Sequence, residues 1–226
     1  MAKQSPHQGI KLNNKNKNSL RYTALLWSWP IYFSLYFLTE RFIPGSRCYT
    51  SYCALDNSIP FCEVFVIPYL LWYPLIAISL GYFLFYDAEN FKRLQTYIMI
   101  VQFIATLIYI LLPTKQELRP EFFQRDNTLT KLVAYIYRMD TNTGVCPSLH
   151  CTISLGIASV WLKKEDASKA LKAAICILCT AICLSTLFIK QHSILDFLAS
   201  IPLFLLGERL IYRQLFTISR PESPMP

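Results

Sequence analysis

The sequence predicts an all-α integral membrane protein, a bundle of six transmembrane helices with both termini in the cytoplasm. Three observations lead to this prediction. Of the 226 residues, 54% are apolar and only 16% are charged. In a soluble domain roughly a quarter of all residues are charged. The apolar residues are gathered in long runs, and basic residues are concentrated in alternate connections between these runs.

The apolar runs give the expected helices in order. A run of about 18 or more uncharged apolar residues can cross a membrane. Residues 22–39, 64–86 and 94–114 meet this test, and residues 145–162 and 173–189 come close. A sixth run, 193–212, is apolar except for Asp196, Glu208 and Arg209. We therefore expect one membrane domain at 21–218, between a disordered basic tail at 1–20 and a short tail at 219–226.

The basic residues predict the orientation. Cytoplasmic loops of membrane proteins are enriched in Lys and Arg. The N-terminal tail, the second and fourth connections and the C-terminal end carry such residues: Lys3, Lys11, Lys15, Lys17, Arg21, Lys92, Arg93, Lys163, Lys164, Lys169, Lys172, Arg213 and Arg220. All four segments lie on one side if both termini are cytoplasmic. The net charge of +8 is therefore explained by a membrane rather than by a nucleic-acid partner.

Two groups among the eight cysteines could form a disulfide or a metal site. Cys48, Cys53 and Cys62 share the first outer loop, where one disulfide is plausible and its pairing stays open. Cys176 and Cys179 form a C-x-x-C within the fifth expected helix. No histidine or acidic residue completes a zinc set there, so this pair is expected to serve packing and not metal binding.

The chemistry is expected in the outer loops, where three motifs meet at one membrane surface. The first is the end of the third helix, with Lys115 and Arg119. Pro120 disfavours helical backbone at Arg119, so this side chain is expected on extended chain just past the helix. Its planar fork can hold two phosphate oxygens. The alternative is that Arg119 binds no phosphate and only extends its charged end to the membrane interface.

The second motif is C-P-S-L-H at residues 146–150, which opens the fourth expected helix. Pro147 suits the first helical position because its missing N–H needs no partner there. The N–H groups of Ser148 and Leu149 would then point out of the helix start and form an anion site with the helix dipole. The Ser148 hydroxyl adds a donor, and His150 can reach a bound phosphate. The alternative is a plain cap with an incidental histidine.

The third motif places His192 four residues before Asp196. If the sixth helix begins near His192, the two side chains share a face. The carboxylate would hold the proton of one imidazole nitrogen and leave the other free to attack. A structural His–Asp pair is the alternative.

Together the motifs supply the parts for phosphoryl transfer through a phosphohistidine. His192 would attack phosphorus and His150 would protonate the departing oxygen, while cations and amide dipoles stabilise the equatorial oxygens. No acidic cluster suggests a divalent metal, so we expect neither a metal nor another cofactor.

These motifs resemble those of the type 2 phosphatidic acid phosphatase superfamily, the lipid phosphate phosphatases, whose pattern is K-x6-R-P, P-S-G-H and S-R-x5-H-x3-D. The six-helix layout is similar as well. The resemblance implies a set of roles: phosphate binding for Arg119, the acid for His150, the nucleophile for His192, its orienting partner for Asp196, and the motif serines for Ser148 and Ser185.

The sequence departs from that pattern at three positions. Leu112 stands where the family has its lysine, and Lys115 is the nearest substitute. Leu149 replaces the glycine of P-S-G-H; this P-S-L-H form resembles the branch that includes fungal inositol phosphorylceramide synthase, a phosphotransferase. Thr186 replaces the arginine of S-R, and Lys190 could supply that charge.

The sequence thus predicts a membrane hydrolase that removes phosphate from a lipid phosphate or diphosphate monoester at the outer face of a bacterial plasma membrane. Undecaprenyl diphosphate, phosphatidic acid and phosphatidylglycerophosphate are candidate substrates. The alternative is a head-group phosphotransferase with the same intermediate. A transporter or structural protein is disfavoured because the ionisable residues gather at one face and not at the midplane.

Overall fold

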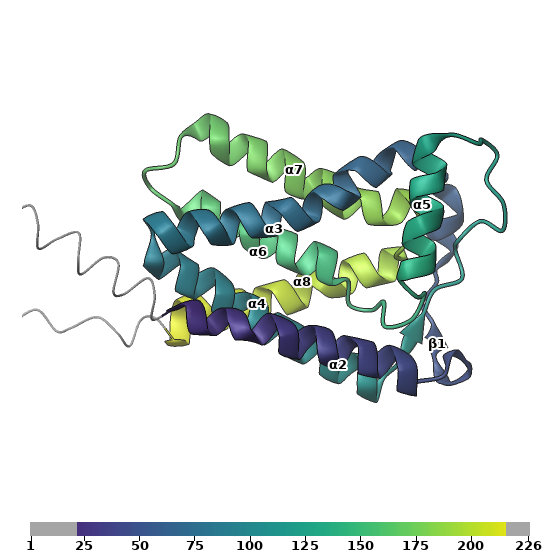
Figure 1. Ribbon diagram of the computed structural model, residues 1–226, viewed down its shortest axis with the longest axis horizontal. Coiled ribbons are helices and arrows are strands. Elements are labelled where there is room, and N and C mark those ends of the chain that lie inside the picture. The colour runs from purple at the N-terminus through teal and green to yellow at the C-terminus, as the bar shows by residue number, and fades with distance from the viewer. Residues whose placement is uncertain (1–21, 216–226) are drawn as a thin grey trace, which may run out of the picture.

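The computed structural model describes residues 22–215, so both expected tails lie outside the described part. Helices account for 75% of the structure, and the long ones run side by side (Figure 1). In chain order the α-helices are α2 (Ser28–Phe42), α3 (Val66–Tyr86), α4 (Ala88–Leu111), α5 (Thr128–Met139), α6 (Leu149–Lys163), α7 (Lys169–Phe188) and α8 (Ile194–Arg209).

Short elements join the helices. A 3-10 helix, Thr23–Trp27, leads into α2, and a π-helix, Leu210–Leu215, follows α8. The loop after α2 contains three more 3-10 turns and the two-residue strand β1 (Tyr49–Thr50). This strand pairs in parallel with β2 (Thr114–Lys115), which follows α4. The pairing connects the loop after α2 to the segment that carries the first motif.

Each of the six apolar stretches is helical, as the sequence predicts. Three helices are long and apolar enough to cross a membrane: Glu63–Tyr86, which includes the 3-10 turn before α3, Ala88–Leu111 and Lys169–Phe188. Helix α6 is apolar but shorter, with 15 residues. Apolar helices of this length and composition indicate a membrane protein.

Helix α5 lies in the connection between α4 and α6, where the sequence predicted no helix. Asn127 caps it, because its side chain accepts the N–H of Thr130 and the Thr130 hydroxyl accepts the N–H of Asn127. Its buried residues Val133 and Ile136 are three apart and pack in a small cluster against the start of α3. Helix α5 therefore covers one end of the bundle.

The packing of α4 against α6 and α8 depends on the ring of Tyr97. This ring lies between two glycines: a Cβ on Gly156 would come within 2.1 Å of Tyr97 Cε1, and a Cβ on Gly207 within 2.6 Å of Tyr97 Cε2. The Tyr97 hydroxyl donates to the Thr152 carbonyl at 2.7 Å. Three helices thus approach each other closely around one aromatic side chain.

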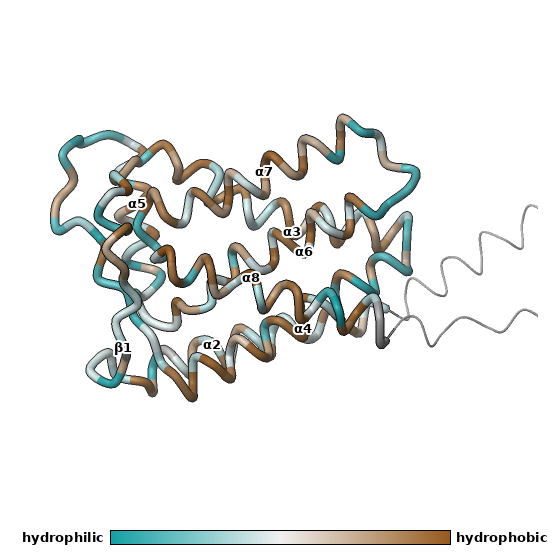
Figure 2. The backbone as a smooth tube through the Cα atoms, turned by 180° about the vertical axis from the view of Figure 1, so that it is seen from behind, coloured by the Kyte–Doolittle hydropathy of each residue, from teal (hydrophilic) through white to brown (hydrophobic). Residues whose placement is uncertain are grey.

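The two ends of the bundle differ in character. The α3–α4 and α6–α7 connections lie at the end where α2 begins and α8 finishes, and they are hydrophilic (Figure 2). There Lys164 Nζ forms ion pairs with Asp87 at 3.0 Å and Asp166 at 2.7 Å. Helix α5, β1 and the α7–α8 link lie at the opposite end (Figure 1). The three sequence motifs therefore share one end of the molecule.

Candidate active site

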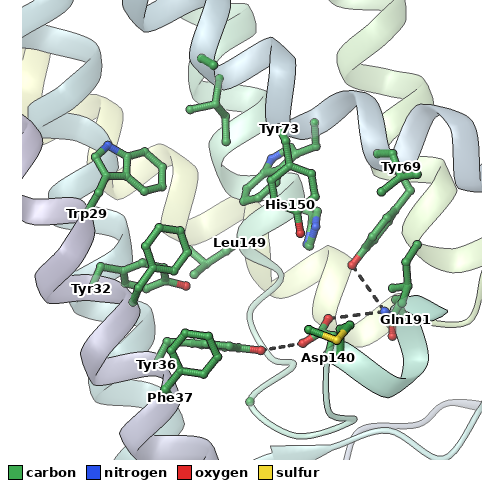
Figure 3. Close-up of a pocket in the computed structure, with 18 of the residues that line it drawn as sticks. Trp29, Tyr32, Tyr36, Phe37, Tyr69, Tyr73, Asp140, Leu149, His150 and Gln191 are labelled. Atoms are coloured by element: carbon green, nitrogen blue, oxygen red, sulfur yellow. Dashed lines mark hydrogen bonds between the residues drawn. The ribbon is translucent and has the colours of Figure 1, made fainter.

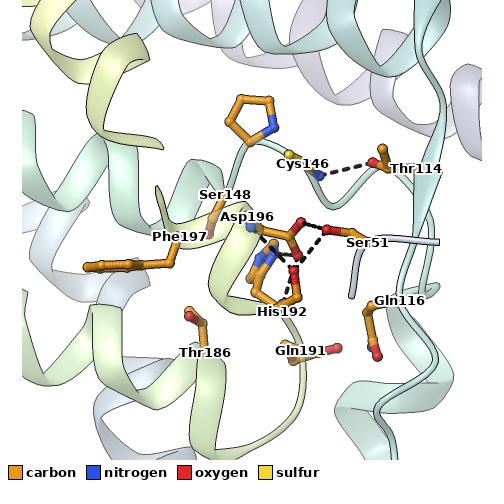
Figure 4. A network of polar contacts seen from close by, with 12 residues as sticks. Ser51, Thr114, Gln116, Cys146, Ser148, Thr186, Gln191, His192, Asp196 and Phe197 are labelled. Carbon is orange, nitrogen blue, oxygen red and sulfur yellow. Dashed lines mark hydrogen bonds and ion pairs between the residues drawn. The ribbon is translucent and has the colours of Figure 1, made fainter. Parts of the chain in front are cut away.

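His192 and Asp196 are held together at the start of α8. His192 Nδ1 lies 3.3 Å from Asp196 Oδ2 (Figure 4). Helix α8 begins at Ile194, two residues after the position that the sequence suggested, and Ser193 is its N-cap. Ser193 and Asp196 form a capping box in which each side chain accepts the N–H of the other residue. The contact with His192 therefore depends on the cap of α8, not on a shared helical face.

Asp196 is fully buried, and three segments fix it. Its Oδ1 accepts the hydroxyl proton of Ser51, which lies just after β1. Its backbone carbonyl accepts the N–H of Ser148 at 3.1 Å. The Ser51 N–H donates to the Lys115 carbonyl at 2.7 Å, so the β1–β2 pairing sets the position of the Ser51 hydroxyl. Sequence reasoning missed Ser51 because no local pattern marks it.

The backbone of His192 is fixed as well. The N–H groups of Gln191 and His192 both donate to the Thr186 carbonyl, at 2.9 and 3.0 Å. Thr186 stands where the resembled family has an arginine, and here its main chain orients the nucleophile candidate.

The electrostatic setting of His192 favours its protonated form. Burial lowers the pKa of His192, but the hydrogen bond to Asp196 and the negative charge of that carboxylate, with smaller contributions from Cys151 and Asp140, outweigh burial. The net pKa therefore lies above the ordinary value of a histidine. Since Nδ1 faces the carboxylate, Nε2 is the nitrogen left for a substrate.

His150 lies in the first turn of α6, close to His192. The two ring centres are 5.9 Å apart and the rings meet at 61°. The His150 ring stacks on Tyr69 at 4.6 Å and packs against Trp72 at 4.3 Å. Its Nε2 and the Nε1 of Trp72 are buried and have no hydrogen-bond partner within residues 22–215. A phosphate group placed between the two rings can therefore contact both imidazoles.

The start of α6 differs from the expected arrangement. Ser148 is the N-cap and Leu149 is the first helical residue, so Pro147 precedes the helix and does not occupy its first position. The Ser148 N–H is used by Asp196, and the Ser148 hydroxyl accepts the Cys151 N–H at 3.5 Å. Serine is a strong N-cap, which explains the shift. The N–H groups that point out of the helix start are therefore those of Leu149 and His150.

The Arg119 guanidinium is engaged with the chain that follows α5. It donates to the carbonyls of Tyr137, Asp140 and Thr141 at 2.8–3.1 Å. It also donates to Gln191 Oε1 at 2.6 Å. Arg119 thus lies next to the residue before His192, and it holds the end of α5 in place.

The other two candidate cations are also paired. Lys115 Nζ lies 2.6 Å from Glu117 Oε1. Lys190 Nζ donates to the carbonyls of Asp56 and Ile59 in the first outer loop, at 2.9 and 2.5 Å, and burial lowers the pKa of Lys190. The remaining motif serine, Ser185, is buried within α7 and donates to the Ile182 carbonyl.

A cavity of about 820 Å³ lies beside the two histidines. Of the predicted site residues, Leu149, His150 and His192 line it. Arg119, Lys115, Lys190, Ser148, Ser185 and Asp196 do not. The lining also includes Asp140 and Gln191, which sequence reasoning missed because neither belongs to a motif.

The structure offers no metal-binding cluster of three or more His, Cys, Asp or Glu side chains in the part of the chain that it describes. Cys48, Cys53 and Cys62 are free thiols, as are the cysteines of α7. The chemistry available at the site is therefore that of two imidazoles, a buried carboxylate and the amide groups of the α6 start.

No family model matches the chain, and neither the curated proteins nor the solved structures contain a significant match to it.

Proposed function

We propose that this protein is a membrane enzyme that breaks the phosphate ester of a lipid through a phosphohistidine on His192, with water as the usual acceptor. The single observation that carries the proposal is the pairing of His192 Nδ1 with buried Asp196, beside His150 and at the wall of a large cavity. A carboxylate that fixes one imidazole nitrogen is the arrangement that a nucleophilic histidine requires.

The reaction has two steps. In the first, the Nε2 lone pair of His192 attacks phosphorus, the bond from phosphorus to the lipid oxygen breaks, and that oxygen takes a proton from His150. In the second, a water molecule gives a proton to His150 and attacks phosphorus, which releases phosphate and restores His192. The N–H groups of Leu149 and His150 stabilise the charge on the phosphate oxygens.

We place this enzyme in the type 2 phosphatidic acid phosphatase superfamily, with six membrane spans, cytoplasmic termini and an active site at the outer face. The support comes from the R-P, P-S-L-H and H-x3-D motifs at one end of the bundle and from the basic connections at the other end. Lys and Arg favour the cytoplasmic side.

Head-group phosphotransfer is the second candidate, and the cavity favours it. No lysine or arginine within residues 22–215 lines the cavity, although a phosphate monoester with two negative charges would require them. A phosphodiester carries one charge and needs less compensation. The acceptor in the second step would then be the hydroxyl group of another lipid, in place of water.

The test is phosphate release from a panel of lipid phosphates by the purified protein. His192→Ala should abolish release, and His7→Ala is the matched control because His7 lies outside the three motifs. Release that survives in His192→Ala would rule out the phosphohistidine. Head-group exchange with an added alcohol, without phosphate release, would identify the transferase.

A further inference from the structure

Many of the residues that line the cavity beside His192 are aromatic. Trp29, Tyr32 and Tyr36 come from α2 and face Tyr69 and Tyr73 of α3 across the cavity (Figure 3). Trp72 lies on the α3 side, with its ring centre 4.3 Å from that of His150 and 5.1 Å from that of Tyr73. The faces of such rings attract cations that have left water.

A carboxylate lies at the same wall. Asp140 accepts the hydroxyl proton of Tyr36 at 2.6 Å and the side-chain N–H of Gln191 at 3.4 Å. It is the one acidic residue among those described that line the cavity. The Gln191 amide joins it to the Arg119 side chain, since Gln191 Oε1 accepts from Arg119 while Nε2 donates to Asp140. Arg119 also donates to the backbone carbonyl of Asp140 at 3.1 Å.

We infer that this cavity recognises the quaternary ammonium group of a choline-type phospholipid head group. The inference rests on the second candidate of the proposed function, head-group transfer, because it places the phosphodiester of the same head group next to His192. Ring faces and one carboxylate suit a cation that has no N–H to donate. A primary ammonium has three N–H donors that each need an acceptor, and an apolar wall offers few.

The charge of the cavity wall disfavours an anionic head group. Phosphatidic acid would bring two negative charges to a wall that contains Asp140 and, within residues 22–215, neither lysine nor arginine. A zwitterionic head group pairs its positive charge with Asp140. Its single phosphate charge is then left for the amide groups at the start of α6.

The experiment measures binding without turnover. His192→Ala protein in a maltoside detergent is titrated with phosphatidylcholine, phosphatidylethanolamine and phosphatidic acid that carry the same two six-carbon chains, and tryptophan fluorescence reports binding. Phosphatidylcholine should bind at least about tenfold more tightly than the other two, which corresponds to about 1.4 kcal/mol. Equal affinities, or a preference for phosphatidic acid, would overturn the inference.

Variants assign the effect to the cavity wall. Asp140→Asn in the same background should weaken phosphatidylcholine binding about tenfold, as should Tyr73→Leu, which removes one ring from a half-exposed position. Asp126→Asn is the matched control, since this exposed carboxylate pairs only with Lys131 among the ion pairs of the described chain. Unchanged affinity in a Tyr73→Leu protein that unfolds at the wild-type temperature contradicts the inference.

The outcomes separate this inference from the proposed function. Tight phosphatidylcholine binding by a protein that neither releases phosphate nor exchanges head groups supports the cavity assignment and removes the enzyme. Phosphate release from phosphatidic acid that depends on His192, with no preference for choline lipids in binding, supports the enzyme and removes the cavity assignment.

Discussion

The hydrogen bonds around Asp196 determine how this carboxylate orients His192 and stabilises its protonated form. One carboxylate oxygen accepts from Ser51, and the other faces His192 Nδ1 and the Ser193 N–H. All of these groups are buried. Inside a protein such bonds are stronger than in water, and the loss of a single partner leaves a buried charge partly unsatisfied.

Replacement of Asp196 should change both the rate and its pH dependence. The attacking His192 must be neutral, so activity rises as the pH passes through its pKa, and in the wild type that rise lies above the ordinary value of about 6.5. Asp196→Asn removes the two largest effects that raise this pKa, so the rise moves to lower pH. The maximal rate should fall by roughly 10²–10⁴-fold because the tautomer is no longer fixed.

The measurement is the pH profile of kcat and of kcat/KM on the best lipid substrate. Asp126→Asn is the matched control and should keep the wild-type profile. A profile in Asp196→Asn whose acid limb stays at the wild-type pH would show that the carboxylate does not set the pKa of His192.

Ser51 should act as a positioning residue. Ser51→Ala removes one hydrogen bond to the buried carboxylate, so we expect kcat to fall roughly 10- to 100-fold. The rise of activity should move to higher pH, since an unsatisfied Asp196 attracts the His192 proton more strongly. Ser34→Ala, on the exposed side of α2, is the control. A kcat loss without any pH shift would indicate a merely structural serine.

The sequence could predict the imidazoles and the carboxylate, but not how the candidate cations are used. His150, His192 and Asp196 lie within short motifs at helix ends, and a four-residue spacing is a local constraint that survives folding. Arg119 and Lys190 bind backbone carbonyls in loops that are distant in the chain. No local pattern specifies such partners, and the same is true of Ser51.

At the scale of elements, close helix packing depends on residues without side chains. Gly156 of α6 and Gly207 of α8 leave room for the two edges of the Tyr97 ring. Because the ring is held on both sides and its hydroxyl is bonded to Thr152, it cannot turn away from an added methyl group. Protein interiors resist such overpacking.

Gly156→Ala should therefore destabilise the protein by about 1–3 kcal/mol. Gly81→Ala is the matched control, because a Cβ on Gly81 of α3 meets no atom within 4 Å and alanine is the better helix former. Thermal unfolding in detergent, followed by circular dichroism, measures both. Equal unfolding temperatures for the two variants would contradict the close contact.

The elements themselves were predictable to different degrees. Long apolar runs give α3, α4 and α7 directly, since a membrane leaves few alternatives for such segments. Helix α5 was missed because it is short and half polar and therefore forms no long apolar run. Its capping box at Asn127 is a local signal that could have revealed it.

At the scale of the whole molecule, the two ends of the bundle face different compartments in the proposed topology. The end with α5 carries the candidate site, and the other carries the basic connections. The sequence predicts this orientation only through the charge of the loops. The helices would pack against each other in the same way in either orientation of the protein in the membrane.

Single cysteines at the two ends test the orientation. Phe122 is 78% exposed near α5, and Glu165 lies exposed in the α6–α7 connection. In intact cells a membrane-impermeant maleimide should label Phe122→Cys above the background of the wild type. Glu165→Cys should be labelled only after lysis. The opposite result would invert the topology.

The contact between Ser51 and Asp196 joins residues that are 145 positions apart. The loop after α2 is synthesised before α8, so the hydrogen bond that fixes Asp196 forms only after α8 has been made and inserted. An epitope tag placed in that loop should therefore lower the activity of the proposed enzyme, although it changes none of the reacting groups.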